Sequence, residues 1–312
     1  MLAVTRMTSV PFERFDIVRR RLRNQRLSGK PFRSPSEVVS WHLAMQSQDL
    51  SGAKWAIGQR LANATDERVE AAYAQGKILR THVLRPTWHF VAPADLRWLL
   101  ALTAPRIKAS SAPYFRRNGL DAAALRRSRR VLEKRLAGER YATRDELAVE
   151  LSSAGLPSKS EALAYQLIAA ELDGVIVSGP RRSKQHTYAL LDERVAAAQP
   201  LGSDEALAEL AWRYLCGHGP ALAQDLAWWA SITVADAKRG IAANASKLSH
   251  ADLDGKRYWF VPTSRLAEHS EPVVNLLPNY DEQLIAYRFR GNAVGTTLTK
   301  ADEYLVLLDH PL

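Results

Sequence analysis

The sequence predicts a mainly helical α+β protein that is built as a tandem array of winged-helix units. Two observations lead to this prediction. Helix-start signals recur along the chain, and short pairs of strands joined by tight turns follow them. The order of helices and then a hairpin, which is typical of a winged helix, occurs three times in pattern but not in residues. With 312 residues, the chain is long enough to bury a sizeable core in several units.

The first unit is expected within residues 1–92. Ser34 is in position to cap a helix, with Pro35 at the first helical position and Glu37 completing a capping box. This helix is expected to run toward Met45. The unit as a whole is expected to hold three helices followed by two strands, near residues 11–25, 35–45, 66–75, 77–83 and 87–91.

A helical connector is expected over residues 93–140, and the second unit over residues 141–200. Capping boxes at 143–146 and 158–161 each open a short amphipathic helix. Two strands and the basic turn that joins them come next, at residues 175–178, 186–190 and 179–184. Helix, helix and then a hairpin with a cationic tip is the order of a winged helix, in which the second helix would face the major groove.

The third unit is expected over residues 201–265. It begins with a helix near 204–215, and further helices start at Gly219 and at Thr233. A hairpin closes the unit, with its strands and turn at residues 247–253, 256–261 and 254–255. The remaining residues, 266–312, are expected to form a C-terminal strand segment.

The charge balance points to a polyanionic partner. The chain has 43 Lys and Arg against 33 Asp and Glu, a net charge of +10 and a pI near 9.8. A protein this basic often binds nucleic acid, which is therefore the leading candidate. Residues 19–30 and residues 116–135 together carry more positive charge than the net charge of the whole chain.

The second basic segment has the pattern of an amphipathic helix. Three leucines fall on one stripe and three cations fall roughly opposite, namely Leu125, Leu132 and Leu136 against Arg127, Arg130 and Lys134. Another cationic group, Arg181, Arg182 and Lys184, lies at the hairpin tip of the second unit. These cations are expected to contact phosphate, and the alternative is that they only form solvated faces.

Several classes of protein are excluded by what the sequence lacks. Its single cysteine, Cys216, excludes an internal disulfide framework and a cysteine-based zinc site, and fits a reducing cytoplasm. No apolar run approaches the ~18 residues of a membrane helix, and the N-terminus lacks the apolar stretch of a signal peptide. P-loop, dinucleotide-binding, nucleophile-elbow and zinc-deaminase patterns are absent, and the eight histidines show no metal-ligand spacing. We therefore expect a cytoplasmic protein with no membrane association, metal or cofactor.

A short polar stretch at residues 45–49 follows the well-capped helix. Gln46 and Gln48 share one side of an extended chain, whereas on a helix they would point ~200° apart. Each glutamine offers a carbonyl acceptor and an amide donor, so the two together can hold one water molecule. The alternative is that both are surface amides at a helix end. Asp49 could act as a base, add negative potential or cap the next helix, and His89 lies between aromatic residues, which favours a packed histidine.

Three blocks of the sequence resemble the AlkZ-like winged-helix DNA glycosylases, and within them the subgroup with a Gln-x-Gln motif. The blocks are residues 45–48, 84–91 and 276–282, and the likeness runs in the same order from about Arg21 to Tyr287. It implies three winged helices around a basic concave channel. It also implies excision of N7- or N3-alkylated purines from damaged double-stranded DNA, extending to bulky adducts or interstrand crosslinks, by an enzyme associated with the nucleoid.

The resemblance also implies roles for individual residues. Gln46 and Gln48 match the glutamine pair that positions the attacking water. Alkylation makes the purine a cationic, good leaving group, so neutral amides that align a water supply what the reaction still needs. The glutamine motif holds no lysine, so we expect a monofunctional enzyme. DNA contacts are expected from Arg85, Arg127, Arg130, Lys134, Arg181, Arg182 and Lys184, and support of the site from Asp49, His89 and Asp281.

Two alternatives share the same fold and charge. A winged-helix transcriptional regulator would bind DNA without catalysis, and a nucleic-acid chaperone would bind only the backbone. Regulators usually dimerise on two half-sites, whereas one chain with three units has less need to, and we expect a monomer. Release of a modified base would separate the glycosylase from both alternatives.

Overall fold

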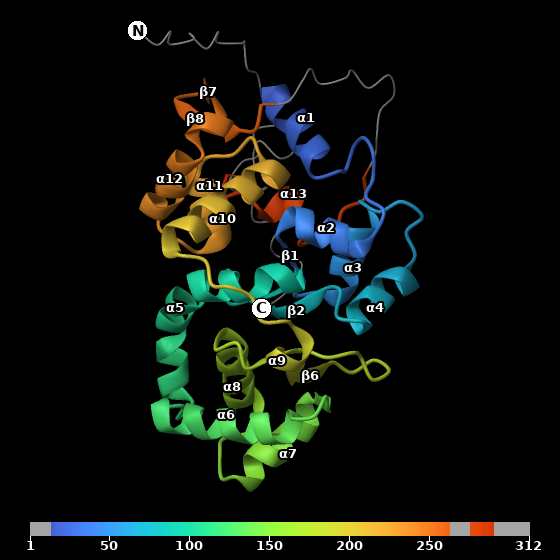
Figure 1. The fold of residues 1–312 in the computed structure, drawn as a ribbon, viewed down its shortest axis with the longest axis vertical. Helices are drawn as coiled ribbons and strands as arrows, with labels where there is room; N and C mark the ends of the chain where they lie inside the picture. Colours follow the sequence, from blue (N-terminus) through green and yellow to red (C-terminus); the bar gives the residue numbers. More distant parts are fainter. Residues whose placement is uncertain (1–13, 263–274, 290–312) are drawn as a thin grey trace.

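The computed structural model describes residues 14–262 and 275–289 (Figure 1). The chain is mainly helical with short antiparallel strands, so the predicted α+β class is confirmed. Most of the C-terminal segment predicted as strands lies outside the described residues. The part that is described, residues 275–289, holds a short helix instead, α13 (Glu282–Ile285).

The first part of the chain surrounds a three-stranded antiparallel sheet. The strand order is β1-β3-β2, and the elements are α1 (Arg14–Asn24), α2 (Pro35–His42), β1 (Ala44–Gln46), α3 (Leu50–Gly58), α4 (Asp66–Ala74), β2 (Leu79–His82) and β3 (Trp88–Val91). Ser34 caps α2 by accepting a hydrogen bond from the Glu37 N–H, as predicted. The Glu37 carboxylate, however, accepts from the Arg33 N–H, so the expected capping box is not closed.

One prediction about this part of the chain was wrong, and one helix was not predicted. The helix expected to run toward Met45 ends at His42, because Leu43 adopts φ +67°, which a continuing right-handed helix does not allow. The residues that follow the helix form β1, which pairs with β3 and places Gln46 opposite His89. The helix α3, which follows at once, carries no clear apolar stripe in the sequence and was not predicted.

The middle of the chain builds a second sheet, of order β4-β6-β5. Its elements are α5 (Pro93–Arg117), α6 (Ala122–Leu136), β4 (Ala142–Thr143), α7 (Arg144–Ser153), α8 (Ser160–Leu172), β5 (Ile176–Ser178), β6 (Thr187–Leu190) and α9 (Leu191–Arg194). The capping box at Thr143 and Glu146 is confirmed. The box expected at Ser158 is wrong, since α8 begins at Ser160 without a side-chain cap. Leu132 and Leu136 of α6 share a buried cluster with α7 and α8, so the connector packs into this group.

The last group of elements is helical and ends in a two-stranded hairpin. It comprises α10 (Ser203–His218), α11 (Ala223–Ala230), α12 (Val234–Ala243), the 3₁₀ turn η1 (Ala245–Lys247), β7 (Ser249–Leu253) and β8 (Lys256–Phe260). Thr233 caps α12, and the hairpin turns at Asp254 and Gly255, both with positive φ, as expected. The helix expected from Gly219 begins only at Ala223, because Ala221 forms backbone hydrogen bonds with Trp259.

The first and last groups pack against each other around one large core. This core includes Leu79 from the first sheet, Leu99 from α5, and Tyr214 and Trp229 from α10 and α11. In Figure 1, α10 to α12 lie beside α1 and above α5, while α6 to α9 lie below α5. The number of winged-helix units and the predicted domain boundaries stay predictions. Within the described residues, no helix has both the length and the apolar character that crossing a membrane requires.

Candidate active site

The two glutamines lie on an extended segment at the end of β1. The Ser47 N–H donates to the Trp88 carbonyl at 2.8 Å, so the pairing with β3 continues one residue beyond Gln46. Met45 and Ser47 are buried, whereas Gln46 is half-buried and Gln48 is exposed. This alternation is that of an extended chain, and it turns both glutamines toward the same, more open side.

The main chain of this segment is held by two charged side chains. The Gln46 N–H donates to Oε1 of Glu282 at 2.8 Å. Nε of the buried Arg80 donates to the Ser47 carbonyl at 3.0 Å, and its Nη2 to the Gln48 carbonyl at 3.4 Å. The Arg80 guanidinium also lies 4.0 Å from the ring centroid of Trp88. The backbone of the glutamine segment is therefore fixed on both its donor and its acceptor side.

The glutamine side chains themselves remain mostly open to new partners. Oε1 of Gln48 accepts from the Trp88 N–H at 3.4 Å, a long hydrogen bond. Oε1 of Gln46 is buried and has no hydrogen-bond partner among the described residues. An amide oxygen in that position can accept a hydrogen bond from a water molecule or a substrate hydroxyl.

Glu282, the first residue of α13, contacts the main chain of Gln46. Its Oε2 accepts a hydrogen bond from Nε1 of Trp229 at 2.9 Å and lies 3.6 Å from Nε2 of His218. Burial alone would raise the pKa of this carboxyl group. The contact with His218, the nearby charge of Arg85 and the Gln46 N–H outweigh that effect and lower the pKa of Glu282 to about 2. The carboxylate is therefore ionised at neutral pH.

His89 is a packed, neutral histidine, as expected from its aromatic neighbours. Burial lowers the pKa of His89 to about 3, and the charge of Arg85 adds to the shift. Its Nδ1 lies 2.9 Å from the Thr87 carbonyl, so the neutral ring carries its proton there. Its Nε2 faces Nη2 of Arg85 at 3.4 Å. His89 therefore supports β3 opposite Gln46 and carries no positive charge at neutral pH.

The two predicted acidic supports have structural partners. Asp281 is fully buried and accepts two hydrogen bonds from Arg60, at 2.7 and 2.8 Å. It also caps α13, and so fixes the segment that carries Glu282. The exposed Asp49 accepts from the Ser51 N–H at 3.0 Å and caps α3. Of the three roles considered for Asp49, the cap is the one observed.

The predicted DNA-contacting cations differ in how they are engaged. At the hairpin tip between β5 and β6, Arg181 pairs with Glu70 at 3.2 Å and Arg182 with Glu146 at 2.6 Å. Lys184 is exposed and forms no ion pair within the described part of the chain. The guanidinium of Arg85 lies 5.0 Å from the ring centroid of Trp228 and next to His89, the residue that pairs with Gln46.

The cationic face of α6 is exposed as predicted. Arg127 donates to the Ala154 carbonyl at 2.5 Å, while Arg130 and Lys134 form no ion pair with any described residue. The first basic segment, residues 19–30, is different. Arg21 is buried, with its guanidinium 3.5 Å from the ring centroid of Tyr287, so it belongs to the core and not to a phosphate-binding surface.

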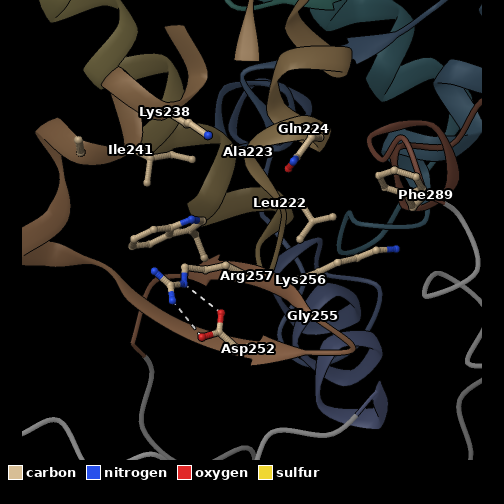
Figure 2. Close-up of a pocket in the computed structure, with 12 residues that line it drawn as sticks. Leu222, Ala223, Gln224, Lys238, Ile241, Asp252, Gly255, Lys256, Arg257 and Phe289 are labelled. Atoms are coloured by element: carbon tan, nitrogen blue, oxygen red, sulfur yellow. Dashed lines mark hydrogen bonds and ion pairs between the residues drawn. The ribbon is translucent and has the colours of Figure 1, made fainter. Parts of the chain in front are cut away.

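A cavity of about 790 Å³ lies apart from the glutamines, between α11, α12 and the β7–β8 hairpin (Figure 2). Leu222 and Ile241 give it apolar walls, and Lys238 contributes a cation. Arg257 at its edge is bound to Asp252 by two hydrogen bonds, of 2.9 and 3.0 Å. None of the residues predicted for the site lines this cavity. No group of His, Cys, Asp or Glu among the described residues is arranged to hold a metal ion.

The two residues that hold the main chain of the glutamine segment, Glu282 and Arg80, were not predicted from the sequence. Glu282 lies within the block 276–282 used for the family resemblance, yet only its neighbour Asp281 was singled out. Its role depends on a contact between residues 236 positions apart. Arg80 carries no local signal, because an arginine in a short strand is usually exposed.

A protein-family model, DNA glycosylase AlkZ-like, matches residues 39–301, which is most of the chain. The chain belongs to the AlkZ-like DNA glycosylase family. A curated relative, the Interstrand DNA cross-link repair glycosylase of Streptomyces sahachiroi, is 23% identical over an alignment of 290 residues that covers 85% of this chain and 75% of that protein. The solved structure of Streptomyces sahachiroi DNA glycosylase AlkZ matches with a TM-score of 0.68 and 22% identity, over 78% of this chain and 68% of that one.

Membership in the AlkZ-like family confirms the predicted enzyme class, a DNA glycosylase and therefore a hydrolase, with DNA as its substrate. The two non-catalytic alternatives find no support in it. The match to the solved structure confirms the fold. The Gln-x-Gln subgroup and the roles of the individual site residues stay predictions.

Proposed function

We propose that this AlkZ-like enzyme hydrolyses the N-glycosidic bond of N7- or N3-alkylated purines in double-stranded DNA, with Gln46 and Gln48 positioning the attacking water. One observation carries the proposal. The two amides lie on the same side of an extended segment whose main chain is fixed by Glu282 and Arg80. A fixed pair of neutral acceptors suits a reaction in which alignment of the nucleophile is the main requirement.

The chemistry of the substrate explains why neutral amides suffice. An alkyl group on N7 or N3 gives the purine a positive charge, so the C1′–N9 bond breaks with its electron pair moving onto the base. The base leaves neutral and the sugar acquires oxocarbenium character. The water oxygen then bonds to C1′, and one of its protons passes to solvent. Amide oxygens of Gln46 and Gln48 accept hydrogen bonds from this water and hold it on the open face of the sugar.

We further propose that the enzyme is monofunctional, because the glutamine motif holds no lysine that could attack the sugar. The nearest lysine in sequence, Lys54, donates to Asp66 and Glu70. Burial alone would lower the pKa of Lys54, but these hydrogen bonds raise it above its usual value. Lys54 therefore stays a cation and is a poor nucleophile.

The substrate range proposed here includes bulky adducts and interstrand crosslinks. A relative that is 23% identical is named as an interstrand cross-link repair glycosylase, which supports this range. A net charge of +10 supports tight, salt-dependent binding to duplex DNA, so we place the enzyme on the nucleoid. We propose that it acts as a monomer, because one chain with three winged-helix units has less need to dimerise.

Excision from DNA that contains a single N7-methylguanine tests the proposal. The full chain is incubated with the duplex, and abasic sites are scored by strand cleavage after mild alkali. We expect abasic sites and free N7-methylguanine, and no covalent adduct on borohydride treatment. A duplex without the methyl group is the matched control. Absence of abasic sites at saturating enzyme would contradict the proposed substrate, and a trapped adduct would contradict the water mechanism.

A further inference from the structure

Three buried carboxylates lie in α11 and at the start of α13, namely Asp225, Asp281 and Glu282. They differ in how their negative charge is balanced. Asp281 forms a bidentate ion pair with Arg60. Asp225 lies 3.8 Å from Arg21. Glu282 forms no direct ion pair with a lysine or arginine of the described chain; His218 lies 3.6 Å from it, and the charge of Arg85 acts on it from farther away.

Burying a carboxylate without a cationic partner is costly. At Glu282, the carboxylate that contacts the glutamine motif, the contact with His218, the charge of Arg85 and the Gln46 N–H offset this cost and keep the group ionised. Glu282 is about 1% exposed, and its two oxygens accept from the Gln46 N–H and from Nε1 of Trp229. Both donors are neutral, so they hold the carboxylate without removing its negative charge.

The proposed reaction has a need that the glutamines do not meet. As the base leaves, positive charge develops on the sugar, and neutral amides provide little to stabilise it. Asp49 is exposed and engaged as a helix cap. Oε1 of Glu282 is 2.8 Å from the Gln46 nitrogen. Bond lengths within Gln46 then keep its side-chain amide within about 8 Å of that oxygen. Over such a distance, through a buried region, a unit charge acts strongly.

Resting on the proposed glycosylase reaction, we propose that Glu282 is a positioning residue of the site: its carboxylate fixes the main chain of Gln46 and supplies the negative potential that stabilises the sugar cation in the transition state. Such preorganised charge acts where charge develops during the reaction and adds little to binding of the uncharged sugar.

The variant Glu282→Gln removes the charge and keeps the shape. Its carbonyl oxygen can still accept from the Gln46 N–H, but its NH₂ group would face the Nε1–H of Trp229. The double variant Trp229→Phe/Glu282→Gln removes that facing donor, so the uncharged site can be studied even where Glu282→Gln alone unfolds. Trp229→Phe by itself loses the same donor and keeps the carboxylate, which makes it the matched control.

Two measurements on the full-length chain separate charge from structure. The first is the single-turnover rate of N7-methylguanine excision at saturating enzyme. The second is the ratio of two dissociation constants, for a duplex with an abasic tetrahydrofuran and for one with a pyrrolidine nucleotide, whose protonated ring mimics the sugar cation. We expect Glu282→Gln and the double variant to excise ~10- to 30-fold more slowly and to lose most of the wild-type preference for the cationic duplex. Trp229→Phe should stay within ~3-fold of wild type in both measurements, and tetrahydrofuran affinity should change less than ~2-fold throughout.

A charge-free variant that retains both the excision rate and the cation preference would overturn the assignment of Glu282. So would equal slowing in Trp229→Phe and in the double variant with the cation preference unchanged, since that pattern reports structure alone. Failure of the proposed function is distinguishable from these results, because the wild-type enzyme would then excise no alkylated purine in the first measurement.

Discussion

The glutamine segment and the hairpin tip between β5 and β6 both offer polar groups to a ligand, yet they place their charges differently. At the glutamine segment the exposed Gln48 and the half-buried Gln46 are neutral amides, and the charges of Glu282 and Arg80 are buried behind the main chain. At the tip the polar groups are themselves cations: Arg182 and Lys184 are exposed, Arg181 is half-buried, and the two arginines pair with Glu146 and Glu70.

The difference separates two kinds of function within one protein. Buried charges next to neutral side chains can shape a reaction with little effect on how strongly the protein attracts DNA. Exposed cations attract the phosphates of DNA, and this attraction weakens as salt is added, but the cations take no part in the reaction. Changes at the glutamine segment should therefore alter stability or catalysis, and changes at the tip should alter the salt dependence of binding.

The largest expected effect is on stability, at the buried ion pair of Asp281 and Arg60 that fixes α13 behind the glutamine segment. Asp281→Ala leaves Arg60 as an unpaired buried cation and removes the cap of α13. We expect a loss of about 3–5 kcal/mol in the free energy of unfolding, measured by urea denaturation.

The matched control is Asp252→Ala, which breaks the exposed ion pair with Arg257. It should leave the denaturation midpoint unchanged. A wild-type midpoint in Asp281→Ala would show that α13 is not held by this pair.

Acidification should lower the free energy of unfolding through His89 and Glu282, which support the glutamine segment. His89 has its pKa lowered from 6.5 to about 3 in the folded protein, so the unfolded chain binds a proton that the folded chain excludes between these values. The free energy of unfolding should fall as the pH drops through this window, by up to about 1.4 kcal/mol per pH unit from this group. Glu282, whose pKa is lowered from 4.5 to about 2, should add a further loss below pH 4.5.

Urea denaturation at pH 7 and pH 5 measures the combined effect of His89 and of His42 and His186, whose pKa values burial also lowers. His89→Asn removes one of these imidazoles and should reduce the dependence on pH in this range without abolishing it. Stability that rises on acidification from pH 7 to pH 5 would contradict the neutral, buried histidine.

The smallest expected effect is at the hairpin tip. Replacing Arg181, Arg182 and Lys184 with glutamine should reduce the slope of log K against log salt by ~1 to 2 units. The reduction falls short of three because two of the cations already have acidic partners. DNA affinity at several salt concentrations measures it, and the excision rate at saturating enzyme should not change.

The pair Arg130→Gln/Lys134→Gln on α6 provides the comparison. Both cations are exposed and form no ion pair among the described residues. A normal slope in the tip variant with a reduced slope in the α6 variant would place the duplex on α6 instead.

Local signals in the sequence predicted much of the fold. The cap at Ser34, the capping box at Thr143 and the turn at Asp254 and Gly255 each depend on a few adjacent residues, and the structure has all three. The box expected at Ser158 failed although its residue types were correct. A side-chain cap is worth only about 1 kcal/mol, so surrounding packing can move a helix start.

Long-range contacts explain what the sequence analysis missed. The glutamine pair was found because its two members are neighbours in sequence. Glu282 and Arg80 reach the same segment from α13 and β2, and only the folded chain brings them together. Arg21 shows the reverse case, since a residue in a basic run proved to be buried against Tyr287.

Single-turnover excision of N7-methylguanine by the wild type and by the Gln46→Ala, Gln48→Ala and double variants tests the central claim most directly. Each measurement is made with the duplex fully bound, and affinity is recorded in parallel. We predict abasic sites from the wild type, a ~10- to 1000-fold slower reaction in each single variant, and DNA affinity within ~2-fold of wild type. Full activity in the double variant would contradict the claim that these two glutamines position the water.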